Sequence, residues 1–290
     1  MSSRIFFLFL VAISFSACAG EDFFEATVDI ETPPHKPALA VTANFAAGDT
    51  TLRIYLTHSL DILSQTDAEP IPDADVEIFK DGTSLGKALY FSDKLYKLPL
   101  VQALPAEMAT YELKISAPGY DPVQASQVMP PPVPIISATF EIDGAIDDDG
   151  ERVDELTIEF EDPAGVENYY SVFAYVVFDD QYTEEFSLGS LDPITEEGMD
   201  NYLLKDVTFD GKRYEWRLKA YRFFELTDDV KMYVVLRSIT ADQYFFSRSV
   251  QLSYDTDDNP FAEPVIIHNN IEGGYGIFSL ESRDVKEVEF

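Results

Sequence analysis

Short runs in which apolar and polar residues alternate recur along this chain, and they restrict it to a fold built mainly of β-strands. Successive side chains of a strand point to opposite faces, so each run has one face for a core and one for water. Turn signals such as Lys80-Asp81-Gly82 separate the runs. Short strands joined by turns are typical of an antiparallel sandwich. The alternating runs are 52–57, 74–79, 111–116, 155–160 and 214–220.

The second half of the chain adds two apolar strands and one helix to this pattern. Residues 168–178 form a long aromatic run, and residues 232–237 are apolar enough for a central strand. Thr240 and Gln243 have the spacing of a capping box, in which each side chain serves a free backbone N–H group. Apolar residues then recur at helical spacing. We therefore expect a helix near 241–252.

Proline-rich segments divide the chain. The segments 32–37 and 129–134 hold several prolines each, and such segments are stiff, extended spacers. We interpret 130–134 as the linker between an N-terminal β-sandwich domain at 38–129 and a C-terminal β-sandwich domain at 135–290. The chain is 46% hydrophobic, which is enough to bury a core.

Three segments of the first half give a more specific fold expectation. The strand Ala74-Asp-Val-Glu-Ile, the pair Tyr111 and Leu113, and the turn Gly119-Tyr120 together resemble immunoglobulin-like domains of the transthyretin and carboxypeptidase-regulatory kind. Together with the strand and helix patterns above, this resemblance leads us to expect a mainly β protein with two immunoglobulin-like or transthyretin-like antiparallel β-sandwich domains and one short helix in the C-terminal domain. It implies no activity.

The amino terminus has the features of an export signal. Arg4 precedes the apolar run 5–13, and small residues lead to Cys18, the single cysteine of the chain. The run is too short to span a bilayer as a permanent helix. We expect a signal peptide at 1–17, lipid on Cys18 and a lipid-anchored linker at 18–37. The alternative is ordinary cleavage that leaves a free amino-terminal cysteine.

Acidic residues after the cysteine refine the expected location. Residues 19–22, Ala-Gly-Glu-Asp, resemble the export signal that sends lipoproteins of Bacteroidota to the cell surface. This implies an outer-membrane, lipid-anchored protein that faces the cell exterior. The formal charge of −33 argues against nucleic acid and anionic lipid headgroups as partners, because both bind through basic surfaces.

No arrangement of residues in the sequence indicates a reaction. There is no Gly-x-Ser-x-Gly nucleophile motif or phosphate-binding loop, and the histidines His35, His58 and His268 are scattered. We therefore expect no enzyme, no catalytic residue and no cofactor. The acidic segments 147–151 and 255–259 have oxygen ligands suited to calcium, but solvated turns are the favoured interpretation and we assign no metal ligand.

The carboxyl-terminal segment has the most distinctive sequence of the chain. It reads Asn259-Pro-Phe-Ala-Glu-Pro264, and then Asn270-Ile-Glu-Gly-Gly-Tyr-Gly-Ile-Phe278. With the export signal, the 74–78 strand, the Tyr169-Tyr170 pair and the helix entry at 238–244, it resembles a Bacteroidota lipoprotein family known only as domain of unknown function 4249. The resemblance implies a partner of TonB-dependent outer-membrane transporters that binds substrate or acts as a lid.

Two sets of residues are candidates for binding. Glycines permit positive φ or close backbone approach, so the ending forms either an exposed glycine-aromatic loop that contacts a transporter or a closing strand with a glycine bend. Tyrosines in acidic, loop-like stretches are candidates for ligand binding, and these are Tyr182 and Tyr202. The candidate partner-binding residues are Asn270, Ile271, Gly273, Gly274, Tyr275, Gly276 and Phe278.

Two other functions remain open at this point. Tandem immunoglobulin-like domains suit a surface adhesin or structural module. Acidic loops together with exposed aromatic side chains suit a calcium-dependent glycan-binding protein.

Overall fold

The computed structural model describes residues 35–61, 64–178, 182–185, 187–199, 201–222, 227, 230–257, 259 and 261–288. The expected signal peptide 1–17, Cys18 and most of the linker 18–37 lie outside these residues. Residues 37–290 form one compact unit. Among the described residues, no helix has both the length and the apolar character needed to cross a membrane.

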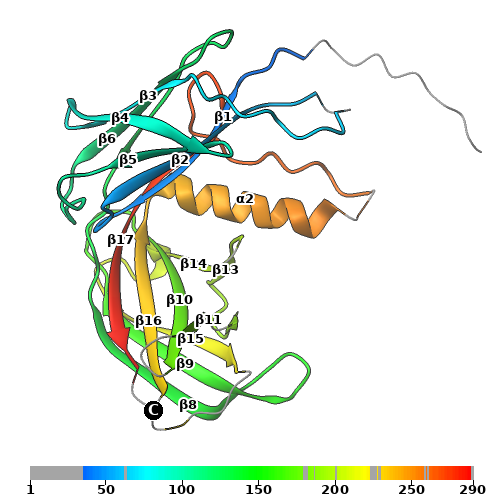
Figure 1. Ribbon diagram of the computed structural model, residues 1–290. Helices are drawn as coiled ribbons and strands as arrows, with labels where there is room; N and C mark the ends of the chain where they lie inside the picture. The colour runs from blue at the N-terminus through cyan, green and yellow to red at the C-terminus, as the bar shows by residue number, and fades with distance from the viewer. Residues whose placement is uncertain are drawn as a thin grey trace, which may run out of the picture. The chain divides into compact units, whose positions relative to one another are not determined.

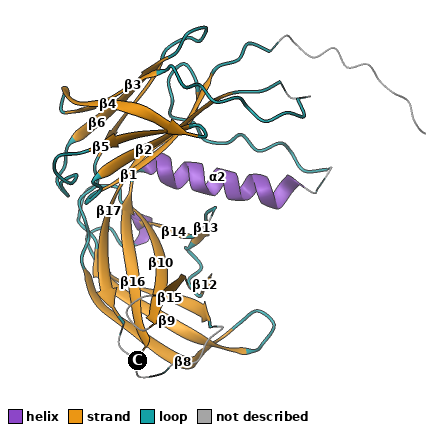
Figure 2. Ribbon diagram, viewed as in Figure 1, coloured by secondary structure: helices purple, strands orange, loops and turns teal. Residues whose placement is uncertain are grey.

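The expectation of a mainly β protein is confirmed, as Figure 2 shows. All seven runs interpreted as strands are strands, and their bounds differ from the expected ones by at most three residues. The strands of the first half are β1 Leu39–Ala46, β2 Thr51–His58, β3 Asp75–Lys80, β4 Thr83–Ser92, β5 Leu95–Pro99, β6 Thr110–Ser116 and β7 Val123–Val128. Those of the second half are β8 Ile135–Ile146, β9 Arg152–Glu161, β10 Tyr169–Phe178, β11 Tyr182–Glu185, β12 Ser187–Ser190, β13 Glu196–Glu197, β14 Tyr202–Lys205, β15 Arg213–Tyr221, β16 Val230–Ile239 and β17 Tyr275–Glu287.

The carboxyl-terminal strand β17 joins the two halves of the larger sheet. In that 13-stranded sheet, the order β10-β16-β17-β1-β2 places β17 between strands of the second and first halves (Figure 1). Its first half, from Tyr275, pairs in parallel with β1. Its second half, from Glu281, pairs antiparallel with β16. The expected antiparallel order therefore holds for the other described pairings but not for β1 and β17. A separate sheet has the order β12-β15-β9-β8.

Two main hydrophobic clusters lie between these strands. The first includes Phe45, Ile54 and Tyr111, and its members from the first half of the chain extend to Met129. The second begins at Val133 and includes the fully buried Trp216. The change of cluster falls at the proline-rich segment 130–134. The first cluster also holds Ile271, Phe278 and Leu280 from the carboxyl-terminal end. The division into domains itself stays a prediction.

The expected helix is present as α2, Ala241–Asp257, and it is longer than 241–252 at its carboxyl end. Tyr244, Ser247 and Val250 form its buried face. The predicted capping box is wrong, because the buried hydroxyl of Thr240 has no hydrogen-bond partner among the described residues. Thr240 instead uses its backbone, since its N–H donates to Leu280 and its carbonyl accepts from Tyr244. The strand β16 therefore leads directly into the helix.

Candidate functional site

The carboxyl-terminal segment 270–278, predicted as a partner-binding loop, folds back on the start of β17. The Asn270 side chain accepts a hydrogen bond from the Phe278 N–H at 2.9 Å and donates to the Phe278 carbonyl at 2.7 Å. Ile271 is 3% exposed and Phe278 is fully buried, and both lie in the first hydrophobic cluster. These two side chains therefore contribute packing and are not available for direct contact with a partner.

The glycines of this segment lie against the backbone of β1. Gly276 has a φ of +111°, and a Cβ atom there would lie 1.9 Å from the Val41 carbonyl oxygen. A Cβ atom on Gly274 would lie 2.4 Å from the Leu39 carbonyl oxygen. No larger residue fits either position without moving the backbone. This geometry is that of a closing strand with a glycine bend, which was one of the two readings of the sequence.

The remaining residues of the segment reach the surface. Tyr275 is 55% exposed at the start of β17. Gly273 lines a polar hollow of about 540 Å³ together with Asp75, Lys114 and Glu272. Among the predicted partner-binding residues, Tyr275 is thus the large side chain that is placed to contact another molecule.

A hydrogen-bonded junction centred on Asp242 holds this segment against α2. One Asp242 carboxylate oxygen lies 2.6 Å from His268 Nε2, and the other accepts from the side-chain amides of Asn270 and Gln127. Burial opposes ionisation of Asp242, but these hydrogen bonds outweigh burial and hold its pKa below the ordinary value. Because Gln127 belongs to β7, the junction joins β7, the helix and the ending. His268 is therefore hydrogen-bonded, as expected for a structural histidine.

The segment between α2 and this junction exposes large apolar side chains that the sequence interpretation did not select. Phe261 is 94% exposed, Ile266 91% and Ile267 44%. Beside them, Phe245 and Leu252 of α2 are 37% and 48% exposed, and the two elements border a groove of about 500 Å³. Exposed apolar side chains that gather in one place mark sites of contact with other molecules. This surface, defined by Phe245, Leu252, Ile266 and Ile267, is called the apolar surface below.

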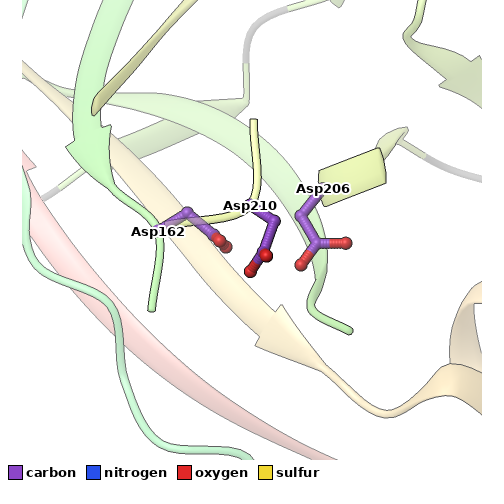
Figure 3. A group of neighbouring side chains, drawn as sticks. All are labelled: Asp162, Asp206 and Asp210. Carbon is purple, nitrogen blue, oxygen red and sulfur yellow. The ribbon is translucent and has the colours of Figure 1, made fainter. Parts of the chain in front are cut away.

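The structure also brings together three carboxylates that the sequence analysis missed. Figure 3 shows Asp162, Asp206 and Asp210, whose nearest carboxylate oxygens all lie within 4.8 Å of one another. Burial and the charges of the other two raise the pKa of Asp206, although a hydrogen bond from the Asn168 N–H opposes this.

Each carboxylate of this cluster already has a structural partner. Asp162 accepts hydrogen bonds from the Tyr170 hydroxyl at 2.5 Å and from the Gly211 N–H at 2.9 Å. Asp210 accepts from the Gly165 N–H at 2.7 Å. The cluster therefore ties together the loops that follow β9 and β14.

The two acidic segments weighed for calcium differ from each other. Asp147 accepts hydrogen bonds from the N–H groups of Asp149 and Glu151, so the first segment is a self-capped turn. Asp255 and Asp257 lie in the last turn of α2, which extends beyond its expected end. The first part of the second segment is therefore helical and is not the solvated turn that was expected.

The two candidate ligand-binding tyrosines lie on short strands. The backbone of Tyr182 belongs to β11, and its side chain lies outside the described residues. Tyr202 is in β14 and packs against the second hydrophobic cluster, where it is partly buried. Burial raises the pKa of its hydroxyl. Tyr202 also borders a small cavity of about 250 Å³ with Phe173 and Gly198.

Fold and site together define an acidic, mainly β protein that exposes an apolar segment beside its helix. The chain belongs to the family described as Domain of unknown function (DUF4249), which matches residues 25–287. This confirms the resemblance seen in the sequence. No curated protein matches the chain.

Several solved structures are distantly similar to this chain. An α-L-rhamnosidase from Aspergillus terreus is 12% identical, with 71% of this chain and 28% of that chain covered and a TM-score of 0.31. A DUF4785 family protein from Legionella pneumophila is 10% identical, with 69% and 52% covered and a TM-score of 0.24. A chimeric titin Z1Z2 tandem is 12% identical, with 87% and 98% covered and a TM-score of 0.23. The chain thus covers less than two thirds of the length of the first two structures.

Proposed function

We propose that this protein is a non-enzymatic accessory subunit of a TonB-dependent transporter in the outer membrane of Bacteroidota. It supplies a substrate-binding or lid surface and is anchored by lipid on Cys18, with its body at the cell surface. The body consists of two immunoglobulin-like or transthyretin-like β-sandwich domains. The export signal, the acidic residues after Cys18 and the similarity of the ending to its family support this proposal.

The apolar surface is the observation that carries the proposal. An acidic protein with a formal charge of −33 is well solvated, and it has no need of exposed isoleucine and phenylalanine for folding. Ile266 is 91% exposed and Leu252 is 48% exposed. The transfer of such a side chain from water into an interface contributes on the order of 1.5–3 kcal/mol when it becomes fully buried. Such a surface suits a protein that works in a complex.

Co-purification tests the proposal directly. The full chain, tagged at its carboxyl terminus, is isolated from detergent-solubilised outer membranes of its own organism. The proposal predicts recovery of a β-barrel transporter in stoichiometric amount, and mass spectrometry is expected to find acyl chains on Cys18. A Cys18→Ser variant is the matched control, since it keeps the body and loses the anchor. Recovery of the lipidated protein alone contradicts the proposal.

A further inference from the structure

The segment Glu263–Ile267 has the properties of an unpaired strand. It follows α2 and returns along the helix toward β17 (Figure 1), and it belongs to no sheet. His268, the next residue, is fixed by a hydrogen bond from its N–H to Ser249 Oγ at 2.9 Å. Within the part of the chain that the structure describes, no hydrogen bond uses the backbone of residues 263–267. Their N–H and C=O groups, apart from the missing N–H of Pro264, are therefore open to another strand.

The side chains of this segment are arranged as those of an extended chain. Val265 is partly buried, Ile266 is 91% exposed and Ile267 is 44% exposed. Exposure is highest at the central residue, as in an extended chain whose successive side chains face opposite ways, and all three residues border the groove beside α2. The groove between the helix and the segment is lined by Phe245, Leu252 and these residues. An added strand thus finds backbone partners along one side and an apolar groove for its alternate side chains.

The charges around the groove indicate which kind of strand it accepts. Glu263 and Asp255 are exposed, and neither forms an ion pair with a described residue. The one basic residue that lines the groove, Arg248, is paired with Glu196. Asp255 follows the groove residue Leu252 by about one helical turn, and Glu263 precedes Val265 by two residues, so the rim near the carboxyl end of α2 is acidic. An acidic rim favours a partner whose apolar residues are flanked by lysine or arginine. A second copy of this chain is disfavoured, because each copy has a formal charge of −33.

We propose that Glu263–Ile267 binds an extended, basic-flanked apolar segment of a partner protein by β-strand addition. Main-chain hydrogen bonds provide the attachment, the groove selects apolar side chains at alternate positions, and the acidic rim selects the flanks. The proposal names the partner chemistry of the apolar surface and in that respect rests on the proposed function. The proposal predicts the sequence pattern of the partner segment, so a peptide with that pattern can be synthesised and tested.

Synthetic peptides test this proposal with the purified body of the protein, residues 19–290. The probe is Lys-Lys-Val-Thr-Val-Thr-Val-Lys-Lys. One comparison peptide has proline in place of the central valine, and the other has glutamate in place of every lysine. We expect the probe to bind at least 10-fold more tightly than either comparison peptide in calorimetry. We also expect hydrogen exchange at residues 265–267 to slow when the probe binds. Equal binding of the proline peptide, no binding of any peptide, or unchanged exchange overturns the proposal.

Protein variants locate the binding. Ile266→Pro removes a backbone donor at a residue that is 91% exposed, so folding is expected to persist, and peptide affinity is expected to fall at least 10-fold. Val101→Asp changes a fully exposed apolar residue that lines a different hollow, and it is expected to leave affinity unchanged. Recovery of a transporter with the Ile266→Pro variant as with the unchanged protein overturns this inference and leaves the proposed function intact. If the probe binds but no transporter is recovered, the proposed function fails and the inference about strand addition stands.

Discussion

The side-chain amide of Asn270 forms two hydrogen bonds with the backbone N–H and C=O of Phe278. These are the bonds that the backbone of a neighbouring strand would otherwise form. The Asn270 side chain thereby closes the glycine bend over residues 271–277 and fixes the start of β17. Because β17 pairs with both β1 and β16, this contact affects strands of both hydrophobic clusters. The ending of the chain is thus part of the framework, and it positions Tyr275 at the surface.

Replacement of Asn270 by alanine tests this role of the side chain. The change leaves the backbone groups of Phe278 without partners, and a lost buried hydrogen-bond partner costs about 1–3 kcal/mol. We expect the free energy of unfolding in urea to fall by this amount. Gln102→Ala removes an exposed side-chain amide and is the control, for which a change below about 0.5 kcal/mol is expected. Equal stability of the two variants contradicts the structural role of Asn270.

Two glycines with positive φ form a matched pair for a second prediction. Gly276→Ala places a Cβ atom 1.9 Å from the Val41 carbonyl oxygen, and the parallel pairing of β1 and β17 must open to admit it. We expect a loss of at least about 3 kcal/mol in the free energy of unfolding. Gly150→Ala meets no atom within 4 Å and carries only the backbone strain of its φ of +86°. For that variant about 1–2 kcal/mol is expected. Similar losses in both variants contradict the close approach at Gly276.

The carboxylate cluster of Asp162, Asp206 and Asp210 gives a prediction about pH. The pKa of Asp206 is raised above its ordinary value of 3.8 by burial and by its two neighbours, so the folded protein binds this proton more tightly than the unfolded chain. The contribution of Asp206 to stability is therefore fully present below pH 3.8 and is lost as the pH rises through the folded pKa.

An Asp206→Asn variant tests the sign of this effect. The amide keeps an acceptor for the Asn168 N–H and removes the charge. At pH 7 we expect its melting temperature to exceed that of the unchanged protein by about 2–4 °C, the shift that about 1 kcal/mol produces. The difference in melting temperature is expected to vanish near pH 3.5. The Asp149→Asn variant, which removes an exposed carboxylate, is the control in the same pH series. A lower melting temperature at pH 7 contradicts charge repulsion in the cluster.

Seven of the strands and the helix were predictable from the sequence because their signals are local. Alternation in runs such as 214–220 places Trp216 and Leu218 on one face, and both are buried. The pairing of β1 with β17 was not predictable in this way, because it joins residues near opposite ends of the chain. The capping box failed for a related reason. Packing against other elements buries Thr240, which overrides the local preference of its hydroxyl.

The candidate site was predicted only in part, and the misses have physical causes. Gly274 and Gly276 were singled out for the right chemistry, close backbone approach, which the structure uses for folding. The run Val265-Ile-Ile was not singled out, since nothing in its sequence distinguishes a buried strand from an exposed one. The exposure of Ile266 follows from the junction at Asp242, which fixes His268 against α2 and leaves the preceding residues outside the sheet.

Photo-crosslinking from position 266 in intact cells tests the central claim most directly. Ile266 is replaced by a photoreactive phenylalanine derivative in the full, anchored chain, and the same replacement at Val101 is the control. The account predicts an adduct with a β-barrel transporter from position 266 and none from position 101. An adduct of equal yield from both positions, or none from position 266 while the protein is present in the outer membrane, would contradict it.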